Sequence, residues 1–383
     1  MPTPIYLDYA ATTPVDQRVA DVMMSHLTME GVFANPASRS HIFGWQAEAA
    51  VERSRKQVAD LFGADTREIV WTSGATEANN LAIKGAALAR QDRGRHIISS
   101  LSEHKAVIDC VSYLETQGFE VTWLKPQSNG EVSLATVEQA IRGDTILISL
   151  MHVNNETGAI NDVTEIAKLA RSKEILFHID AAQSAGKLDL NVETIPADMI
   201  SVCAHKIYGP KGIGALFVRR NSSFILPAQV HGGGHERGMR SGTLATHQIV
   251  GMGEAFEIAS NNRVAEQELI RNLKLLFLRE ISELDGVILN GDPGNTISGI
   301  LNISFPALDG QVLLSAMPGV AISSGSACTS ATMSPSHVLK SMGVDDHVAL
   351  SALRFSFGRF TTEQDVRDAA SQLVHSVKRM TSV

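Results

Sequence analysis

The chain has 383 residues, of which 44% are hydrophobic and 19% charged, and its formal net charge is −8. This balance is typical of a globular protein long enough for two domains, and the negative charge argues against direct nucleic-acid binding. Cys110, Cys203 and Cys328 have no Cys-x-x-Cys spacing, so we expect neither a disulfide framework nor a metal site. With no basic leader segment and no apolar run of about 20 residues, we predict a cytoplasmic protein without a membrane span.

The first part of the chain is expected to form an arm followed by helices. Residues 1–15 are typical of a short extended arm. Residues 16–60 have a helical pattern that is broken by a turn at 35–38. The apolar spacing over 44–62 predicts an amphipathic helix.

From residue 68 onward, apolar runs alternate with helical patterns. This alternation predicts an α/β fold with a mostly parallel sheet covered by helices on both faces. Ligands of such sheets bind at the carboxyl ends of the strands, where Ser73, Asn154, Asp180 and Lys206 are expected to converge on one pocket. The predicted strands are 68–73, 96–100, 119–124, 144–151, 175–180, 199–204 and 214–219, and the helices between them include 103–117, 133–141 and 163–173.

A long helical stretch follows over 243–283, with a break expected at Asn261-Asn262. It would lead from a large domain to a smaller one. Residues 286–383 mix short strands with helices, and the chain is expected to end in a helix over 362–380.

Two charged residues follow predicted strands. Taken alone, Lys206 is typical of a surface lysine, and Asp180 of a helix cap or an ion-pair partner. Together they suit pyridoxal phosphate. A lysine forms a Schiff base with the aldehyde of this coenzyme, and an aspartate pairs with its pyridinium nitrogen.

Residues 72–80 form a small-residue turn between a strand and a helix. Backbone N–H groups and hydroxyls at a helix N-terminus bind phosphate. The alternative is a simple helix cap made by Ser73 or Thr76. The turn has neither the lysine of a P-loop nor the G-x-G-x-x-G pattern, so it favours a single phosphate over a nucleotide.

With these motifs in place, the chain resembles the cysteine desulfurases of the IscS/NifS type. The resemblance implies a fold type I pyridoxal phosphate-dependent transferase, with a large coenzyme-binding domain over 16–260. A smaller α+β domain would comprise 1–15 and 261–383 and carry a mobile cysteine loop at about 323–332. The motifs that carry the resemblance are residues 6–14, 35–39, 72–80, 103–104, 151–156, 180–183, 201–212, 231–243, 323–330 and 353–360.

The resemblance also implies roles for individual residues. Lys206 would tether the coenzyme and shuttle protons, His104 would stack on its ring and act as an acid–base group, and Cys328 would be the nucleophile. His104 could otherwise be a solvent-facing residue at a helix start. Asn155 and Arg354 would bind the substrate, and Arg359 would be a structural ion-pair residue. The implied coenzyme-binding set is Ala75, Thr76, His104, Asn155, Asp180, Gln183, Cys203, His205, Lys206 and Thr243.

Two members of this set carry further expectations. The family usually has serine at the position of Cys203, and a thiol is the weaker hydrogen-bond donor. We therefore expect pyridoxal phosphate to bind less tightly, and Cys203 to be a buried structural thiol. Thr243 would reach the phosphate of a neighbouring subunit, which implies a homodimer.

Cys328 lies among small residues over 323–331, which favours a mobile loop and a reactive thiol over a core cysteine. The implied reaction converts L-cysteine into L-alanine and a persulfide on Cys328, whose sulfur then passes to an acceptor protein. Iron–sulfur cluster assembly, tRNA thiolation and DNA phosphorothioation stay open as destinations, because the chain lacks the C-terminal extension with which the housekeeping enzymes dock an iron–sulfur scaffold. The alternatives are a selenocysteine lyase, another enzyme of this fold such as an aminotransferase, and a non-catalytic sulfur-relay protein.

Overall fold

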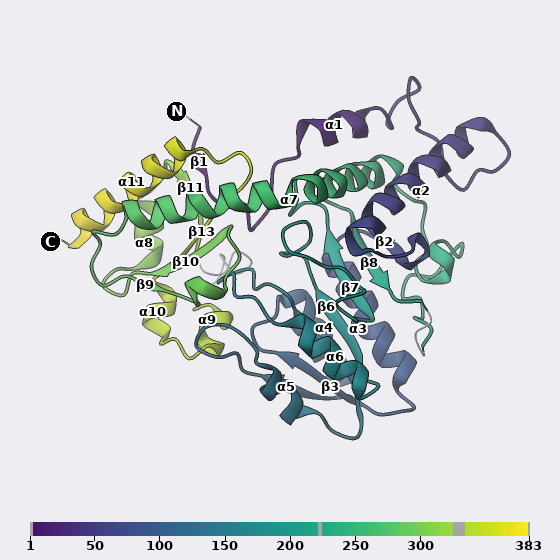
Figure 1. Ribbon diagram of the computed structural model, residues 1–383, viewed down its shortest axis with the longest axis horizontal. Coiled ribbons are helices and arrows are strands. Elements are labelled where there is room, and N and C mark those ends of the chain that lie inside the picture. The colour runs from purple at the N-terminus through teal and green to yellow at the C-terminus, as the bar shows by residue number, and fades with distance from the viewer. Residues whose placement is uncertain (1–2, 221–223, 325–333, 382–383) are drawn as a thin grey trace.

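The computed structural model describes residues 3–220, 224–324 and 334–381. Its largest feature is a seven-stranded sheet in the order β2-β8-β7-β6-β5-β3-β4 (Figure 1). All neighbours are parallel except β8, which runs antiparallel to both β2 and β7. The strands are β2 (Ile69–Thr72), β3 (His96–Ser100), β4 (Glu120–Leu124), β5 (Thr145–Met151), β6 (Leu176–Asp180), β7 (Met199–Cys203) and β8 (Gly214–Val218).

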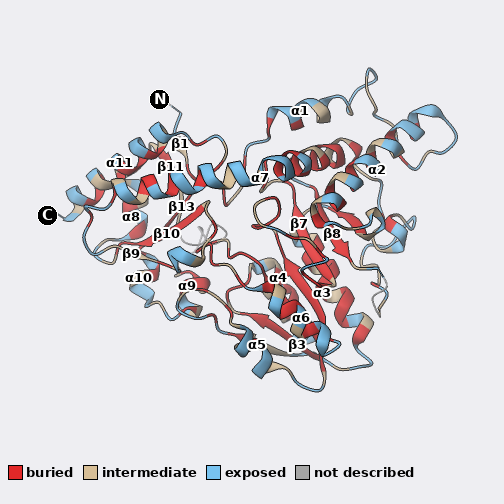
Figure 2. Cartoon of the chain, in the orientation of Figure 1, coloured by how far each residue is buried: buried red, intermediate tan, exposed pale blue. Residues whose placement is uncertain are grey.

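The predicted α/β class is confirmed, and each of these strands lies within a predicted range or within one residue of it. The reason is burial, since six neighbouring strands of the sheet (β2, β8, β7, β6, β5 and β3) are fully buried and consist mostly of apolar or small residues. Figure 2 shows the strands of this sheet as a buried layer within the larger part of the chain.

Helices cover both faces of the sheet (Figure 1). The amphipathic helix α2 ends at Gly63, whose φ of 63° is the left-handed conformation that glycine adopts most easily. α6 begins after Asp162, whose side chain caps the backbone of Glu165. The helices of this part are α1 (Gln17–Met24), α2 (Ile42–Phe62), α3 (Ala75–Arg90), α4 (Lys105–Thr116), α5 (Leu134–Ala140) and α6 (Val163–Ser172), with a 3-10 turn η1 (Thr66–Glu68).

The long helix α7 (Thr246–Glu280) joins two hydrophobic cores. Ile249 and Phe256 pack in the core under the large sheet, whereas Ile270 and Phe277 pack in the core of the smaller part. The break expected at Asn261-Asn262 is wrong, because α7 is continuous there. Asparagine is only mildly unfavourable within a helix, and the Asn262 side chain bonds back to the Ile258 carbonyl at 2.8 Å.

The smaller part is built on a four-stranded sheet in the order β12-β13-β10-β9. The N-terminal arm joins this part, since β1 pairs with β11 and Leu7 is fully buried in its core. Its elements are β1 (Ile5–Tyr6), β9 (Ile288–Leu289), β10 (Ile300–Ser304), β11 (Val320–Ala321), β12 (Ser323–Ser324), β13 (Ala352–Ser356), α8 (Gly310–Ser315), α9 (His337–Ser341), α10 (Asp346–Leu350) and α11 (Glu363–Thr381); the 3-10 turns η2 (Glu236–Gly238) and η3 (Pro293–Asn295) precede and follow α7. None of the described helices is long and apolar enough to span a bilayer.

Candidate active site

A cavity of about 580 Å³ lies at the carboxyl ends of the large sheet, against β13 and the N-terminal arm. Ala10, Ala11 and Thr12 of the arm contribute to its wall. The structure brings most of the sequence-predicted site residues together here: Ser73, Ala75, Thr76, His104, Asn155, Asp180, Gln183, Cys203, His205, Lys206 and Arg354 all line the cavity.

Three predicted residues are not in this lining. Asn154 is buried beneath it and accepts hydrogen bonds from the backbone N–H groups of Glu156 and Thr157, so it shapes a turn. The prediction that Asn154 lines the pocket is wrong, because its side chain bonds the backbone of this turn instead. Thr243 is exposed and lies outside the cavity of its own chain. Cys328 lies outside the described residues.

The start of α3 forms one end of the cavity. Its N-cap is Gly74, with a φ of 150° and no side-chain hydrogen bond to the helix, so the alternative of a cap made by Ser73 or Thr76 is wrong. Instead, the Ser73 N–H donates to Glu77, which is ion-paired with Arg240 at 2.7 Å. The helix N-terminus therefore faces the cavity with uncapped N–H groups, an arrangement that suits a phosphate.

Close backbone packing supports this open turn. A Cβ at Gly214 of β8 would lie 2.7 Å from backbone atoms of Gly74, a contact that real Cβ atoms essentially never make. Gly214 thus lets the sheet run directly beneath the turn.

Asp180 ends β6 with its carboxylate almost fully buried and fixed at both oxygens. Oδ1 accepts a hydrogen bond from the Ala182 N–H at 2.9 Å, and Oδ2 accepts one from Asn79 Nδ2 at 2.7 Å. Asn79 lies within the 72–80 motif, but sequence reasoning assigned that motif only to phosphate binding and so missed the contact of this buried helix residue with Asp180.

Lys206 follows β7 and points to the arm. Its amine donates to the carbonyls of Ala10 and Ala11 at 2.5 and 2.6 Å. Gln183 Nε2 donates to the same Ala10 carbonyl at 2.9 Å, while its Oε1 accepts from Lys187 at 3.4 Å. Burial, with a smaller contribution from the charge of Lys206, lowers the pKa of Lys187 to about 8. Neither the arm backbone nor Lys187 was predicted to belong to the site.

His104 and His205 lie at the cavity wall. His104 caps α4, since its Nδ1 accepts from the Ala106 N–H at 3.1 Å, and it also lines the cavity. His104 therefore lies at a helix start, and it also faces the cavity in which the coenzyme is expected. His205 Nδ1 contacts the Thr12 hydroxyl at 3.1 Å, and burial lowers its pKa to about 4, with Lys206 adding to the effect.

Cys203 is buried at the end of β7, and burial raises the pKa of its thiol to about 11. A thiol with so high a pKa is protonated at neutral pH and is a poor nucleophile. Its environment is that of a structural cysteine at the cavity wall.

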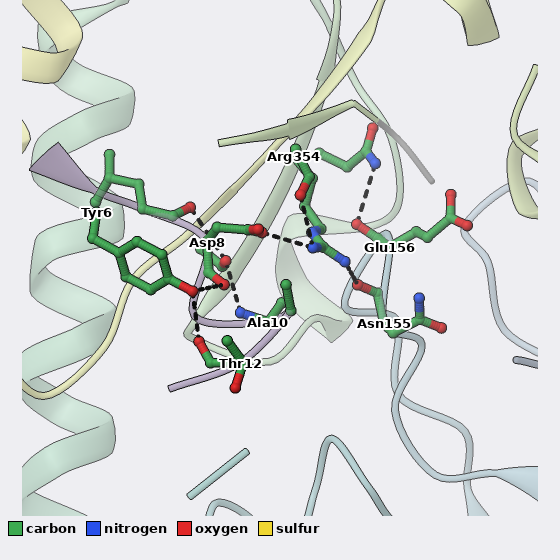
Figure 3. Close-up of polar contacts among 12 residues, drawn as sticks. Tyr6, Asp8, Ala10, Thr12, Asn155, Glu156 and Arg354 are labelled. Carbon is green, nitrogen blue, oxygen red and sulfur yellow. Dashed lines mark hydrogen bonds and ion pairs between the residues drawn. The ribbon is translucent and has the colours of Figure 1, made fainter. Parts of the chain in front are cut away.

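Arg354 on β13 also lines the cavity, and Figure 3 shows its polar contacts. The Arg354 side chain is 1% exposed, and its guanidinium donates to the Asn155 carbonyl and to the Asp8 carboxylate, each at 2.8 Å. Arg359 is absent from the cavity lining and pairs with Asp16 and Glu266. Of the two arginines, the described structure places only Arg354 where a ligand carboxylate could reach it.

The cavity shows no metal chemistry within the described part of the chain, where no group of three His, Cys, Asp or Glu side chains could hold an ion. Around the cavity stand a helix N-terminus, a carboxylate and an amine from the large sheet, and a guanidinium from β13. This set can bind a ligand with a phosphate at one end and a carboxylate at the other.

Comparison with known proteins identifies the class. Residues 5–368 match the family described as aminotransferase class-V. The chain is 56% identical over 380 residues to the cysteine desulfurase IscS of Shewanella sp. (strain ANA-3), covering 99% of this chain and 94% of that protein. A NifS-like protein of known structure superposes with a TM-score of 0.91 at 32% identity over both whole chains. A structure described as SspA in complex with cysteine has a TM-score of 0.83 at 38% identity and covers 93% of this chain and 99% of its own.

The chain belongs to the class-V aminotransferase family of pyridoxal phosphate-dependent enzymes. Within this family it groups with the cysteine desulfurases, and the resemblance found in its motifs is confirmed.

The residues of the cavity fit the coenzyme of this family. The uncapped start of α3 offers N–H donors for the phosphate, the fixed Asp180 carboxylate offers a partner for the pyridinium nitrogen, and Lys206 offers an amine for the aldehyde. The family and the donor set therefore point to the same ligand.

Proposed function

We propose that this chain is a cysteine desulfurase that removes sulfur from L-cysteine, releases L-alanine and holds the sulfur as a persulfide on Cys328. The observation that carries the proposal is the convergence of Lys206, Asp180 and Arg354 on one cavity. An amine, a ring partner and a carboxylate binder are what a coenzyme-bound amino acid requires.

The coenzyme would be held by residues from both walls. Ala75, Thr76, Cys203 and His205 would surround the phosphate, and Thr243 would complete the cup from a neighbouring subunit. Asp180 would pair with the ring nitrogen, His104 would cover the ring, and Gln183 and Asn155 would lie near its phenolic oxygen. Bound pyridoxal phosphate supplies an electron sink for the substrate Cα.

The residues of the chain would supply binding and proton transfer. Arg354 holds the substrate carboxylate, assisted by Asn155, and so fixes the amino acid in one orientation. Lys206 takes the proton from Cα and returns it, because its amine lies where the coenzyme aldehyde would be tethered. The buried, neutral Cys203 takes no part in sulfur chemistry.

Cys328 would carry out the sulfur step as a thiolate. Its sulfur attacks the substrate sulfur, so that an S–S bond forms as the C–S bond breaks. The bonding pair of the C–S bond leaves with the carbon, which takes up a proton and becomes L-alanine. An external thiol or an acceptor protein then removes the outer sulfur of the persulfide.

The substitution Cys328→Ser tests this proposal, with Cys110→Ser as the matched control, since Cys110 is buried in α4 outside the cavity lining. We expect the Cys328 variant to keep the visible absorbance of the coenzyme and to lose persulfide formation and sulfide release. The Cys110 variant should keep the coenzyme absorbance, persulfide formation and sulfide release. Sulfide release from L-cysteine and a reductant at the wild-type rate by the Cys328 variant would refute the assignment, and a parallel assay with L-selenocysteine measures the substrate preference.

We also propose a homodimer. The segment that joins α1 to α2 is largely exposed (Figure 2) and carries apolar side chains that a second copy could cover. Thr243, which is exposed and outside its own cavity, would be free to serve the second subunit. Comparing the sedimentation of the Trp45→Glu variant with that of wild type tests whether this surface contacts a second copy of the chain. The exposed apolar residues of this segment are Leu27, Met29 and Phe33, and those of the adjoining helix ends are Met24 of α1 and Ile42, Phe43 and Trp45 of α2.

The sulfur of Cys328 would pass to an acceptor protein. The net charge of −8 opposes direct contact with nucleic acid, so a protein thiol is the favoured recipient even if tRNA or DNA is the final destination. A reducing cytoplasm suits this chemistry, since Cys328 must return to a thiol after each transfer. Radiolabelled sulfur transfer from the loaded enzyme to an iron–sulfur scaffold, or to a tRNA thiolation or DNA phosphorothioation partner, would identify the recipient.

A further inference from the structure

The carboxylate of Asp8 lies against the guanidinium of Arg354 (Figure 3). Its Oδ1 accepts a hydrogen bond of 2.8 Å from Arg354 Nη2, although the two residues are 346 positions apart in the sequence. The Arg354 side chain is 1% exposed and that of Asp8 is 19% exposed. A buried cation needs a compensating negative charge, and Asp8 supplies it in the absence of any ligand.

The other contacts of the guanidinium are neutral. Nη1 donates to the Asn155 carbonyl at 2.8 Å, and Nη2 also reaches the Ser323 hydroxyl at 3.3 Å. Nε is buried and has no hydrogen-bond partner among the described residues. Because a guanidinium can donate to two carboxylates at once, Arg354 keeps capacity for a further acceptor while bound to Asp8.

A second acid, Glu156, lies nearby but makes no direct ion pair with Arg354 in the described structure. Glu156 accepts a hydrogen bond from the Ser336 hydroxyl at 2.5 Å, and burial raises its pKa to about 7. Asp8 is therefore the carboxylate in direct contact with the guanidinium.

The arm holds Asp8 rigidly. The Ser356 N–H donates to the Leu7 carbonyl at 2.7 Å, and the Ala10 N–H donates to the Ser356 hydroxyl at 2.9 Å. The Tyr6 hydroxyl donates to the carbonyl of Asp8 at 3.1 Å. Two residues further on, Ala10 accepts the hydrogen bond from Lys206, so one short segment contacts both the amine and the guanidinium of the site.

We propose that Asp8 is the resident counter-ion of Arg354, and that an incoming substrate carboxylate shares the guanidinium with it. This inference rests on the proposed role of Arg354 as the carboxylate binder. Asp8 is then a positioning residue with two effects. Its oxygen fixes the orientation of the guanidinium, and its charge weakens the binding of any carboxylate, which favours the release of L-alanine.

Two substitutions separate these effects. Asp8→Asn keeps an oxygen for the Arg354 N–H but removes the charge, whereas Asp8→Ala removes both. The probes are 3-mercaptopropionate, which has the thiol and carboxylate of cysteine but no amine, and its neutral counterpart 3-mercapto-1-propanol. Each is titrated calorimetrically into the holoenzyme, whose visible absorbance and melting temperature show that the variants are folded.

We expect Asp8→Asn to bind 3-mercaptopropionate about tenfold more tightly than wild type, because a like charge a few ångströms away is removed. Binding of the alcohol should not change. The KM for L-cysteine should fall with a smaller change in kcat, and Asp8→Ala should bind the carboxylate probe several-fold less tightly than Asp8→Asn.

Equal affinity of wild type and Asp8→Asn for the carboxylate probe would overturn the inference, as would an equal change for the alcohol. Arg354→Leu keeps the two proposals distinguishable. If this variant still prefers the carboxylate over the alcohol as wild type does, Arg354 is not the carboxylate binder and the proposed function fails at that point. If the preference is lost but Asp8→Asn has no effect, only the role of Asp8 is wrong.

Discussion

Asn79, on the buried face of α3, donates a hydrogen bond of 2.7 Å to the Asp180 carboxylate at the end of β6. The backbone N–H of Ala182 holds the other oxygen of the same carboxylate at 2.9 Å. Asn79 is fully buried and Asp180 is 6% exposed. Two elements of the fold therefore set the orientation of Asp180 before any ligand binds, which is how a site is preorganised for a planar ring.

Replacing Asn79 with leucine should weaken coenzyme binding. The change removes a donor of similar size, leaves one oxygen of a buried carboxylate without its partner, and should lower the free energy of unfolding by about 1–3 kcal/mol. We expect the Kd for pyridoxal phosphate to rise about tenfold, measured by titrating apoenzyme with coenzyme. Asn80→Leu is the matched control, because that half-buried side chain bonds only the Thr76 carbonyl among the described residues; equal effects of the two changes would contradict the role of Asn79.

Gly74→Ala should also weaken coenzyme binding, through the backbone alone. A Cβ at Gly74 would meet no atom within 4 Å, but the φ of 150° is one that residues with side chains rarely adopt. Such strain costs about 1–3 kcal/mol and would move the start of α3 away from its present position. Coenzyme titration and thermal unfolding measure the effect.

Gly143→Ala is the control for this change, since a Cβ there also meets open space and its φ is not in the left-handed region. We expect its stability to stay within about 0.5 kcal/mol of wild type. If Gly74→Ala behaves in the same way, the turn does not depend on the glycine conformation.

The buried ion pair of Arg55 and Glu236 should be important for stability. Arg55 on α2 donates two hydrogen bonds of 2.7 and 2.9 Å to Glu236, and both side chains are less than 5% exposed. Glu236→Gln keeps an acceptor for the Trp71 N–H but removes the buried counter-charge and leaves the guanidinium paired only with Glu52, whose side chain is 53% exposed, so we expect a loss of about 3 kcal/mol. Urea unfolding of both single variants and of Arg55→Met/Glu236→Gln should give a double variant less destabilised than the sum, and additive losses would show that the pair is not coupled.

Much of the large sheet could be predicted from the sequence because its strands are buried. Buried parallel strands consist mostly of apolar residues, and charged residues such as Asp180 and Lys206 stand out at or just after the strand ends. The fold class then places both residues at one edge of the sheet. The roles of His104, Gln183 and Arg354 came only from the family resemblance, since nothing in their local patterns requires them.

The parts that could not be predicted depend on contacts between distant segments. Asn79 and Asp180 are 101 positions apart, and Asp8 and Arg354 are 346 positions apart. Such pairs leave no periodicity in either segment. The unbroken course of α7 through Asn261-Asn262 has a similar cause, because packing against two cores outweighs a small local helix preference.

Glu156 should make the stability of the enzyme depend on pH. It is 2% exposed, and burial raises its pKa from 4.5 to about 7, against the opposing charges of Arg354 and His104. A carboxyl whose pKa is higher in the folded state than in the unfolded state binds more protons when folded, so its stabilising contribution is complete below about pH 4.5 and is lost as the pH rises through about 7. Glu156→Gln keeps the acceptor for the Ser336 hydroxyl and removes the titration.

The variant should therefore gain stability relative to wild type as the pH rises, by on the order of 2 kcal/mol between pH 5 and pH 8. Urea unfolding at several values in this interval measures the difference. Glu115→Gln, a change at an exposed position of α4, should leave the pH dependence of wild type intact. Parallel stability curves for wild type and Glu156→Gln would mean that the carboxyl at position 156 is already ionised throughout the interval, and that the charge of Arg354 outweighs its burial.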